Sequence, residues 1–382
     1  MWFARHRNIE GVAGSPYWRA RFACRILYSC VFLRILGAPW KAHTRPNDVM
    51  IVTLTEGADS GLVRDALAGL GLWTSPFEGQ RGSVQLFVHA HSGNVDRHLL
   101  LSVAGVSDIS EPASRHPRID VQAAPVRFGD IELGGTAEPV LMAGPCSVES
   151  EERIHEVASR LAAIGIRFLR GGAYKPRTSP YDFQGVGTDA LGWLRDAADA
   201  NDLLVVTEAL SESSVDSVAE VADLIQIGSR NMHNGALLEA AGRTGRPVLV
   251  KRGMAATVEE WLSAGEYCLA GGAPAVVFCE RGIRSFDDRT RNLLDLGSVA
   301  LLRHVHGLPV IVDPSHGLGR RDLIPHLSRA AIAAGAAGLL IEVHPEPERA
   351  LSDGPQAVTF EEIESLAREL HAEASFAVSA SG

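Results

Sequence analysis

The sequence has 382 residues, of which 46% are hydrophobic and 21% charged, so it can form a sizeable core and is not a disordered chain. Its length corresponds to two or three domains, and no stretch approaches the roughly 20 uncharged apolar residues that a membrane span needs. Five cysteines do not suit a disulfide scaffold and favour a reducing, cytoplasmic location, while the net charge of −10 argues against a general nucleic-acid-binding protein.

The charge is unevenly distributed, because residues 1–46 hold eight Lys or Arg and a single acidic residue. The rest of the chain holds 28 basic and 45 acidic residues. Phe22–Leu36 is apolar, but Arg25 and Arg34 interrupt it, which argues against a signal-peptide core. We predict a basic, unstructured extension over 1–46; a targeting peptide, an arm that contacts anionic partners, and a natural start at Met50 remain open.

Residues 47–112 predict a small module with the element order β-α-β-β-α-β, the split βαβ of the ferredoxin-like fold. The expected strands are Val49–Leu54, Leu72–Phe77, Val84–His89 and Val106–Ser110. The expected helices begin at Asp59 and at Asn94 or Asp96, and they end near Leu70 and Leu101. The module has no catalytic cluster. We therefore expect it to regulate, to sense an effector or to form oligomers, with a packing appendage as the alternative.

The segment 113–125 is rich in proline and is predicted to be a linker. From 126 to 365 short apolar runs alternate with helical patterns, and 366–382 is expected to be a C-terminal tail. The predicted strands are Val140–Ala143, Phe168–Arg170, Leu203–Thr207, Leu224–Ile227, Val248–Val250, Ala275–Cys279, Val310–Val312 and Leu339–Ile341. Eight buried parallel strands favour a closed (β/α)8 TIM barrel, with an open doubly wound sheet as the runner-up. Val126–Leu133 is predicted to be a hairpin that caps the barrel floor.

Each predicted strand delivers a polar or charged residue at or just after its end. These residues are Cys146, Arg170 with Lys175 and Arg177, Glu208, Arg230, Lys251, Arg281, His316 and Glu342. Barrel active sites lie at this carboxyl-terminal mouth. A Lys or Arg follows four of the eight strands in an acidic chain, which predicts a substrate with more than one phosphate or carboxylate.

A second set of side chains predicts a metal centre. Cys146 follows the first strand, His316 the seventh and Glu342 the eighth, and Asp353 lies in the loop beyond. These three strands are neighbours in a closed barrel, so the four side chains can converge. One thiolate, one imidazole and two carboxylates suit one divalent Mn, Fe, Co or Zn ion, which could polarise a carbonyl group.

Eight motifs in this order closely resemble the 3-deoxy-7-phosphoheptulonate synthase (DAHP synthase) family, type I beta subgroup, which has an N-terminal ferredoxin-like domain. The motifs are GPCSVES (144–150), RGGAYKPRTSPYDFQG (170–185), QIGSRNMHN (226–234), LVKRGM (249–254), CERGIRSF (279–286), DPSHG (313–317), IEVHP (341–345) and SDGPQ (352–356). The resemblance runs from about Met50 to about Glu362, and residues 1–46 have no recognised counterpart.

The resemblance implies a transferase of the shikimate pathway that condenses phosphoenolpyruvate with erythrose 4-phosphate and releases phosphate. The implied metal ligands are Cys146, His316, Glu342 and Asp353. The implied phosphoenolpyruvate ligands are Arg170, Lys175, Arg230, Lys251 and Arg281, with Glu208 near the phosphate; Arg177 and Thr178 would hold the erythrose phosphate. Lys175 is the implied proton donor. The resemblance also implies a homo-oligomer with an aromatic amino acid as a possible effector.

Two other functions remain open at this level. The related 3-deoxy-octulosonate 8-phosphate synthases condense phosphoenolpyruvate with arabinose 5-phosphate on the same barrel. They usually lack the N-terminal module and have a sequence close to KANRSS where this chain has KPRTS at 175–179. A non-catalytic sensor of sugar phosphates would not need all four metal ligands. A nucleic-acid role for the basic arm is a further alternative, although we expect neither a nucleic-acid nor a membrane partner for the folded chain.

Overall fold

The computed structural model describes residues 50–78, 84–89, 95–110, 114–122, 125–176, 179 and 181–380, without the side chains of 77–78 and 371–380. The basic extension predicted over 1–46 lies outside these residues. In the described part of the chain, no helix is both long and apolar enough to cross a membrane.

The N-terminal module is an antiparallel four-stranded sheet with the order β2-β3-β1-β4, as the split βαβ pattern predicts. Its elements are β1 (Ile51–Leu54), α2 (Ser60–Gly69), β2 (Thr74–Glu78), β3 (Val84–Val88), α3 (Arg97–Leu101) and β4 (Val106–Ser110). Asp59 and Asp96 cap the two helices as predicted, by accepting hydrogen bonds from backbone N–H groups of the first turn. Strand residues Val52 and Leu86 pack with Leu67 and Leu100 of the helices in one core.

One strand of the module begins later than the sequence predicts. We expected it at Leu72, but β2 starts at Thr74. The reason is local, because the N–H of Leu72 donates to the carbonyl of Leu67 at 3.0 Å and thereby completes the exit from α2.

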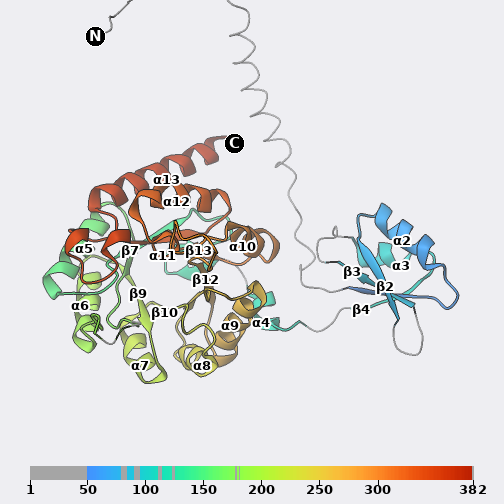
Figure 1. The fold of residues 1–382 in the computed structure, drawn as a ribbon, viewed down its shortest axis with the longest axis horizontal. Helices are drawn as coiled ribbons and strands as arrows, with labels where there is room; N and C mark the ends of the chain where they lie inside the picture. Colours follow the sequence, from blue (N-terminus) through green and yellow to red (C-terminus); the bar gives the residue numbers. More distant parts are fainter. Residues whose placement is uncertain are drawn as a thin grey trace, which may run out of the picture. The chain divides into compact units, whose positions relative to one another are not determined.

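Residues 126–380 form the barrel, which Figure 1 shows as a ring of helices around parallel strands. The strands are β7 (Val140–Gly144), β8 (Phe168–Arg170), β9 (Leu204–Ala209), β10 (Leu224–Ile227), β11 (Val248–Lys251), β12 (Val276–Glu280), β13 (Val310–Val312) and β14 (Gly338–Glu342). Each of the eight predicted strands is present. The sheet closes because β14 pairs with β7 and β9 pairs with β10, so the open doubly wound alternative is wrong.

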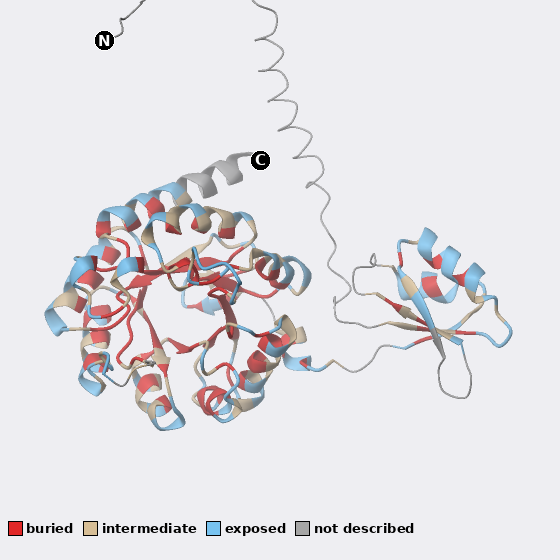
Figure 2. Ribbon diagram, in the orientation of Figure 1, coloured by how far each residue is buried: buried red, intermediate tan, exposed pale blue. Residues whose placement is uncertain are grey.

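The outer ring contains α5 (Glu151–Ala163), α6 (Thr188–Asp199), α7 (Glu212–Val221), α8 (Gly235–Arg243), α9 (Val258–Gly271), α10 (Leu296–Ala300), α12 (Ile324–Ala333) and α13 (Phe360–Ala380). The short helix α11 (Pro314–Leu318) follows β13 directly at the barrel mouth. A π-helical turn (Leu301–Val305) continues α10, and 3-10 turns occupy Arg321–Leu323, Pro347–Arg349 and Gly354–Gln356. Figure 2 shows buried residues on the strands and on the inner faces of the helices. This two-sided burial explains why the strands are continuously apolar.

The predicted hairpin forms β5 (Val126–Phe128) and β6 (Ile131–Leu133). Phe128 packs edge-on against Phe168 of β8, with ring centroids 5.4 Å apart, inside the barrel. The hairpin therefore covers the amino-terminal end of the strands, which leaves the carboxyl-terminal mouth for ligands.

The predicted linker, 113–125, contains a helix that the sequence did not indicate, α4 (Pro117–Val121). Its Ile119 is buried, and Glu266 of α9 accepts hydrogen bonds from the N–H groups of Arg118 and Ile119. Gln122 then pairs through its amide with both backbone groups of Val276, at 2.9 and 2.6 Å. This part of the segment is thus built into the barrel wall. The predicted tail begins inside a helix, because α13 continues through the boundary placed at residue 365, and its Leu366 and Ala367 are buried.

Trp261 of α9 supplies a stability test. It is fully buried, donates from Nε1 to the carbonyl of Val250 at 2.9 Å and packs edge-on against Phe278. We expect Trp261→Ala to lower the free energy of unfolding by about 3–5 kcal/mol through the cavity it leaves. Trp261→Phe should cost about 1–3 kcal/mol, because the buried carbonyl loses its donor.

Denaturant unfolding of the full chain measures both effects. Tyr267→Ala is the control, because Tyr267 lies on the same helix with 55% of its surface exposed, and it should change stability by less than about 0.5 kcal/mol. An equal loss for the Ala variants at 261 and 267 would contradict the packing described here.

Candidate functional site

A polar cavity of about 190 Å³ lies at the carboxyl-terminal mouth of the barrel. Eight of the predicted site residues line it: Arg170, Lys175, Glu208, Arg230, Lys251, Arg281, His316 and Asp353. The structure therefore gathers side chains that the sequence spreads over more than 180 positions. Arg177 and Thr178, predicted to hold a second phosphate, lie outside the described residues.

Arg281 is the clearest sign that this cavity takes an anion. It follows β12, is buried, and among the described residues its Nη1 has no hydrogen-bond partner. Burial lowers the pKa of its guanidinium, since the charged form is poorly solvated there. A buried donor without a partner costs free energy, which a bound phosphate or carboxylate would recover.

The other cations of the cavity have protein partners. The Nζ of Lys251, at the end of β11, lies 2.6 Å from the Oδ2 of Asp313. The Nζ of Lys175 donates to the backbone carbonyl of Cys146 at 2.7 Å. Arg230 donates from Nη1 to the carbonyl of Pro176 at 3.3 Å. These contacts hold three mobile side chains in place and still leave further N–H groups for a ligand.

The four predicted metal ligands come together at the edge of the same cavity. One ligand atom from each of Cys146, His316, Glu342 and Asp353 lies within 4.8 Å of all the others. The Sγ of Cys146 donates to Asp353 at 3.1 Å, and the Nε2 of His316 lies 3.3 Å from Glu342 and 3.8 Å from Asp353. A buried thiol, imidazole and two carboxylates at such short separations could hold one metal ion.

The charges of this cluster favour cation binding. Burial raises the pKa of the Cys146 thiol to about 12, and Glu342 beside it adds to that shift. Burial also raises the pKa of Asp353, but His316, the Cys146 hydrogen bond and Arg291 outweigh it and bring the pKa to about 2. Burial lowers the pKa of His316, so the imidazole is neutral near pH 7. The carboxylates and imidazole are ready ligands, whereas the thiol must lose a proton.

Asp313 orients His316 and was not singled out by the sequence. It is fully buried, accepts from the backbone N–H of His316 at 2.9 Å, and its Oδ2 lies 2.7 Å from Nδ1. Because Nδ1 faces this carboxylate, Nε2 is left to face the cluster. The same Oδ2 pairs with Lys251, so Asp313 connects the cation cavity to the cluster. Burial opposes ionisation of Asp313, but His316 and Lys251 hold its pKa well below the usual value.

Arg170 lines the cavity, as expected of an anion ligand, and also has protein partners. Its Nη1 donates to Glu342 at 3.0 Å and to the carbonyl of Pro145 at 2.8 Å, which leaves other N–H groups for a ligand. Burial alone would raise the pKa of Glu342, but His316 and Arg170 lower it. The contact requires Gly144 before the Cys146 loop, because a Cβ there would lie 2.0 Å from the carbonyl oxygen of Arg170 at a φ of +147°.

Glu208 stands at the end of β9 and accepts a hydrogen bond from Gln226 of β10 at 2.9 Å. Gly228 permits this placement, since a Cβ there would lie 2.1 Å from Oε1 of Glu208. Gln226 is one of the residues that the sequence reasoning missed. The others are Asp182, Arg291, Asp313 and Gln356. Four of these five residues belong to motifs that could have indicated them, namely QIGSR, SPYDFQG, DPSHG and SDGPQ. Arg291 lies outside these motifs; it donates to Gln356 at 3.0 Å.

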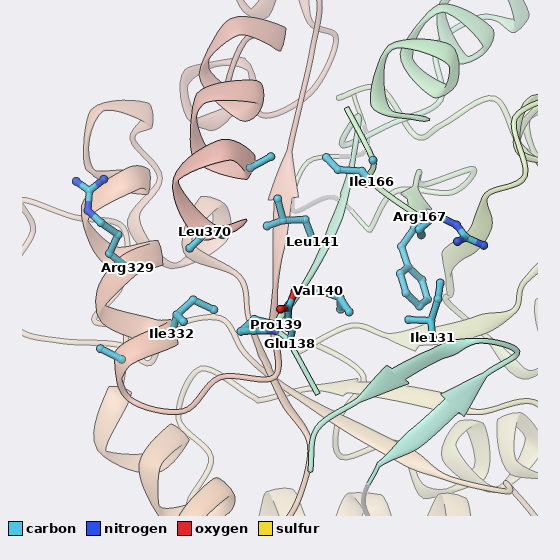
Figure 3. A pocket seen from close by; sticks show the side chains of 14 residues that line it. Ile131, Glu138, Pro139, Val140, Leu141, Ile166, Arg167, Arg329, Ile332 and Leu370 are labelled. Atoms are coloured by element: carbon cyan, nitrogen blue, oxygen red, sulfur yellow. The ribbon is translucent and has the colours of Figure 1, made fainter. Parts of the chain in front are cut away.

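A second cavity, of about 490 Å³, lies near the amino-terminal ends of β7 and β8. Figure 3 shows mainly apolar side chains around it, among them Ile131, Leu141 and Ile332, with Arg167 and Arg329 on opposite sides. Arg167 pairs with Asp130 and Arg329 with Glu369. This cavity is larger, but among its lining residues there is no cluster that could hold a metal or bind two anions. We therefore assign function to the polar cavity at the mouth.

Comparison with known proteins identifies the family of the chain. Residues 114–377 match the model of the DAHP synthetase I family. The chain belongs to this family. It is 52% identical over 245 residues to the phospho-2-dehydro-3-deoxyheptonate aldolase of Thermotoga maritima, an alignment that covers 64% of this chain and 72% of that protein. It is also 35% identical over 263 residues to a 2-dehydro-3-deoxyphosphooctonate aldolase of Rhodopseudomonas palustris, covering 64% of this chain and 91% of the relative.

Solved structures agree with the family over most of the chain. The crystal structure of the Thermotoga maritima DAHP synthase superposes with a TM-score of 0.67 at 41% identity and covers 86% of this chain and 98% of the other. A truncated form of that DAHP synthase gives a TM-score of 0.61 at 47% identity and covers 66% of this chain and 92% of the other. The likeness to the first structure therefore extends beyond the catalytic barrel of the DAHP synthetase I family.

Metal uptake by this DAHP synthetase I family chain should release one proton. The raised pKa keeps Cys146 protonated, while the lowered pKa values of Glu342, Asp353 and His316 leave those groups unprotonated near neutral pH. The apparent affinity for Co²⁺ should thus rise about tenfold per pH unit between about pH 6.5 and 8. Calorimetric titration in buffers of different ionisation enthalpy counts the protons. The Cys146→Ala variant should bind weakly and release none; a pH-independent affinity of the unmodified chain would contradict this charge assignment.

Proposed function

We propose that this chain condenses phosphoenolpyruvate with erythrose 4-phosphate to give 3-deoxy-7-phosphoheptulonate and phosphate, the first step of the shikimate pathway. The observation that carries this function is one mouth that joins a cation-lined cavity to a cluster able to hold a metal ion. The 52% identity to the Thermotoga phospho-2-dehydro-3-deoxyheptonate aldolase supports the choice of reaction.

The cations would bind and align two anionic substrates. Arg281 offers an unpartnered buried donor, and Lys251 and Arg230 stand with it around the cavity, so this group is suited to the phosphate and carboxylate of phosphoenolpyruvate. We place the phosphate of erythrose 4-phosphate at Arg177 and Thr178 on the strength of the KPRTS motif. Holding two like-charged molecules together is itself a large part of the catalysis, because they would otherwise repel each other.

Cys146, His316, Glu342 and Asp353 fit one divalent ion of the Mn, Fe, Co or Zn type. When bound, such an ion would act as a Lewis acid towards the aldehyde of the four-carbon sugar. The residues around the ligands would orient them: Asp313 holds His316, and Arg170 holds Glu342.

The chemistry forms one carbon–carbon bond, from C3 of phosphoenolpyruvate to the aldehyde carbon. Water adds to C2, and the bond between C2 and the phosphate oxygen breaks. The new hydroxyl group needs a proton, and we assign Lys175 as its donor, because its buried Nζ lies beside Cys146 at the boundary between the cation cavity and the metal cluster.

The second candidate reaction is condensation of phosphoenolpyruvate with arabinose 5-phosphate. The 35% identity to the 2-dehydro-3-deoxyphosphooctonate aldolase supports this alternative. The DAHP synthase structure covers 86% of this chain, which favours the four-carbon sugar. For the N-terminal module we propose regulation by an aromatic amino acid in a homo-oligomer, since among the described residues this small α+β module carries no metal-capable cluster of its own.

A phosphate-release assay with the full chain tests the reaction. We expect turnover with phosphoenolpyruvate and erythrose 4-phosphate, at least tenfold slower turnover with arabinose 5-phosphate, and loss of activity with a chelator that added Co²⁺ or Mn²⁺ restores. Addition of each aromatic amino acid in the same assay tests the effector. Faster turnover with the five-carbon sugar would replace the proposed function with its runner-up, and no turnover with either sugar would favour a sensor.

The Arg281→Ala variant tests whether Arg281 serves substrate binding or the stability of the fold. Loss of one charge-assisted contact should cost about 1.5–3 kcal/mol of transition-state binding, a fall in kcat/KM of roughly 10- to 150-fold. Without substrate the variant should be as stable as the parent or more stable, because the parent buries a cation that lacks a hydrogen-bond partner at Nη1 among the described residues.

Steady-state kinetics and thermal unfolding measure the two effects. Arg243→Ala removes an exposed arginine of α8 and is the control that should change neither. A destabilised Arg281→Ala with unchanged kcat/KM would show that Arg281 serves the fold and not the substrate.

A further inference from the structure

Two loops at the barrel mouth are joined to each other beside the metal-capable cluster. The loop after β7 carries Cys146, and the loop after β14 carries Asp353. The hydroxyl groups of Ser147 and Ser352, each next to one of these ligands in the chain, lie 2.7 Å apart and are buried. The second connection is made by Glu149.

Glu149 lies at the end of the first loop, and only 7% of its side-chain surface is exposed. Its Oε1 accepts the N–H of Leu351 at 2.7 Å, two residues before Asp353. Its Oε2 pairs with Arg153 at 2.8 Å and lies 3.4 Å from the Nε2 of His344, at the beginning of the second loop. One carboxylate therefore contacts that loop near its beginning and again in its middle, close to Asp353.

His344 also connects Glu149 to the end of β14. It is buried and comes two residues after the ligand Glu342. Its Nδ1 accepts the N–H of Glu346 at 3.1 Å. Its Nε2 lies 3.2 Å from the Nη1 of Arg153 and 3.4 Å from the Oε2 of Glu149. His344, Arg153 and Glu149 are therefore in mutual contact at the beginning of the second loop.

Asp353 needs such support because its backbone is in an unfavourable conformation. Its φ of +52° and ψ of +27° are left-handed, a region that costs a non-glycine residue about 1–2 kcal/mol. A non-glycine residue keeps a left-handed backbone conformation only where contacts with the surrounding structure stabilise it. Released from these contacts, the loop would relax and move the carboxylate away from Cys146.

We propose that Glu149 is a positioning residue for the metal centre. It holds the loop after β14 so that the Asp353 carboxylate stays close enough to Cys146 for both to bind the same metal ion. The inference rests on the proposed function only in taking the four-residue cluster as a metal site. Glu149 itself stays outside the cluster and acts through Asp353. Partners of this kind typically change metal affinity by 10- to 100-fold when removed.

Titration of the metal-free full chain with Co²⁺ alone tests the proposal, because the thiolate-to-cobalt absorption band reports binding at Cys146. We expect Glu149→Ala to weaken Co²⁺ binding by about 10- to 100-fold while the band is retained. Glu149→Gln keeps the volume and one acceptor oxygen and should lie in between; it also carries the test if the Ala variant fails to fold. Glu152→Ala, an exposed glutamate in the first turn of α5, is the matched control and should bind as the parent does.

A double-mutant cycle separates positioning from a general effect on stability. If Glu149 acts through Asp353, the Glu149 substitution should change Co²⁺ affinity by less than about twofold when it is made in an Asp353→Ala background. Equal effects in the two backgrounds, or an unchanged affinity of Glu149→Ala, would overturn the proposal. A parent chain that fails to bind Co²⁺ would overturn the metal site of the proposed function as well, so the two failures are distinguishable.

Discussion

Closure of the eight-stranded sheet is the constraint on which the site depends. β14 pairs with β7 in a register that sets Glu342 opposite Gly144, so the ligand at the end of one strand lies beside the loop that carries Cys146. Pairing of β13 with β14 brings His316 to the same edge. In an open sheet the first and last strands could lie at opposite edges, and the two ends of the chain would not build one cluster. The glycine at 144 is part of this constraint, because any side chain there would collide with Arg170.

The buried charges of the mouth are arranged around shared carboxylates. Asp313 serves both Lys251 and His316, and Glu342 serves both Arg170 and His316. Each carboxylate is thus desolvated but well paired, which is the condition under which a buried charge is tolerated. Arg281 differs, since among the described residues one of its nitrogens has no partner. An active site pays in stability for such an imbalance, and Arg281 is one of the residues that line the cavity which two anions would occupy.

Much of the site could be predicted because strand ends are visible in a sequence. Arg170, Lys251 and Glu342 each end a continuous apolar run, and parallel strands deliver their carboxyl ends to one face. The partners of these residues could not be predicted in the same way. The pairing of Arg170 with Glu342 joins positions 172 residues apart, and the contact of Glu149 with Leu351 joins positions 202 apart. Helix α4 was missed for a related reason: five residues carry too little periodicity, and its stability comes from Ile119 and Gln122 packing on the barrel.

The sequence by itself determined the barrel, the capped helices of the small module, and the residue types at the mouth, because hydrophobic periodicity, capping residues and motif order are local properties. Tertiary structure alone decided which cation is left without a partner, which carboxylate orients which ligand, and that Asp353 stands in a left-handed conformation beside Cys146. Those outcomes depend on distances between distant segments, and only closure and packing of the barrel set them. The same physics explains the contact of Arg170 with Glu342, which its motif alone did not indicate.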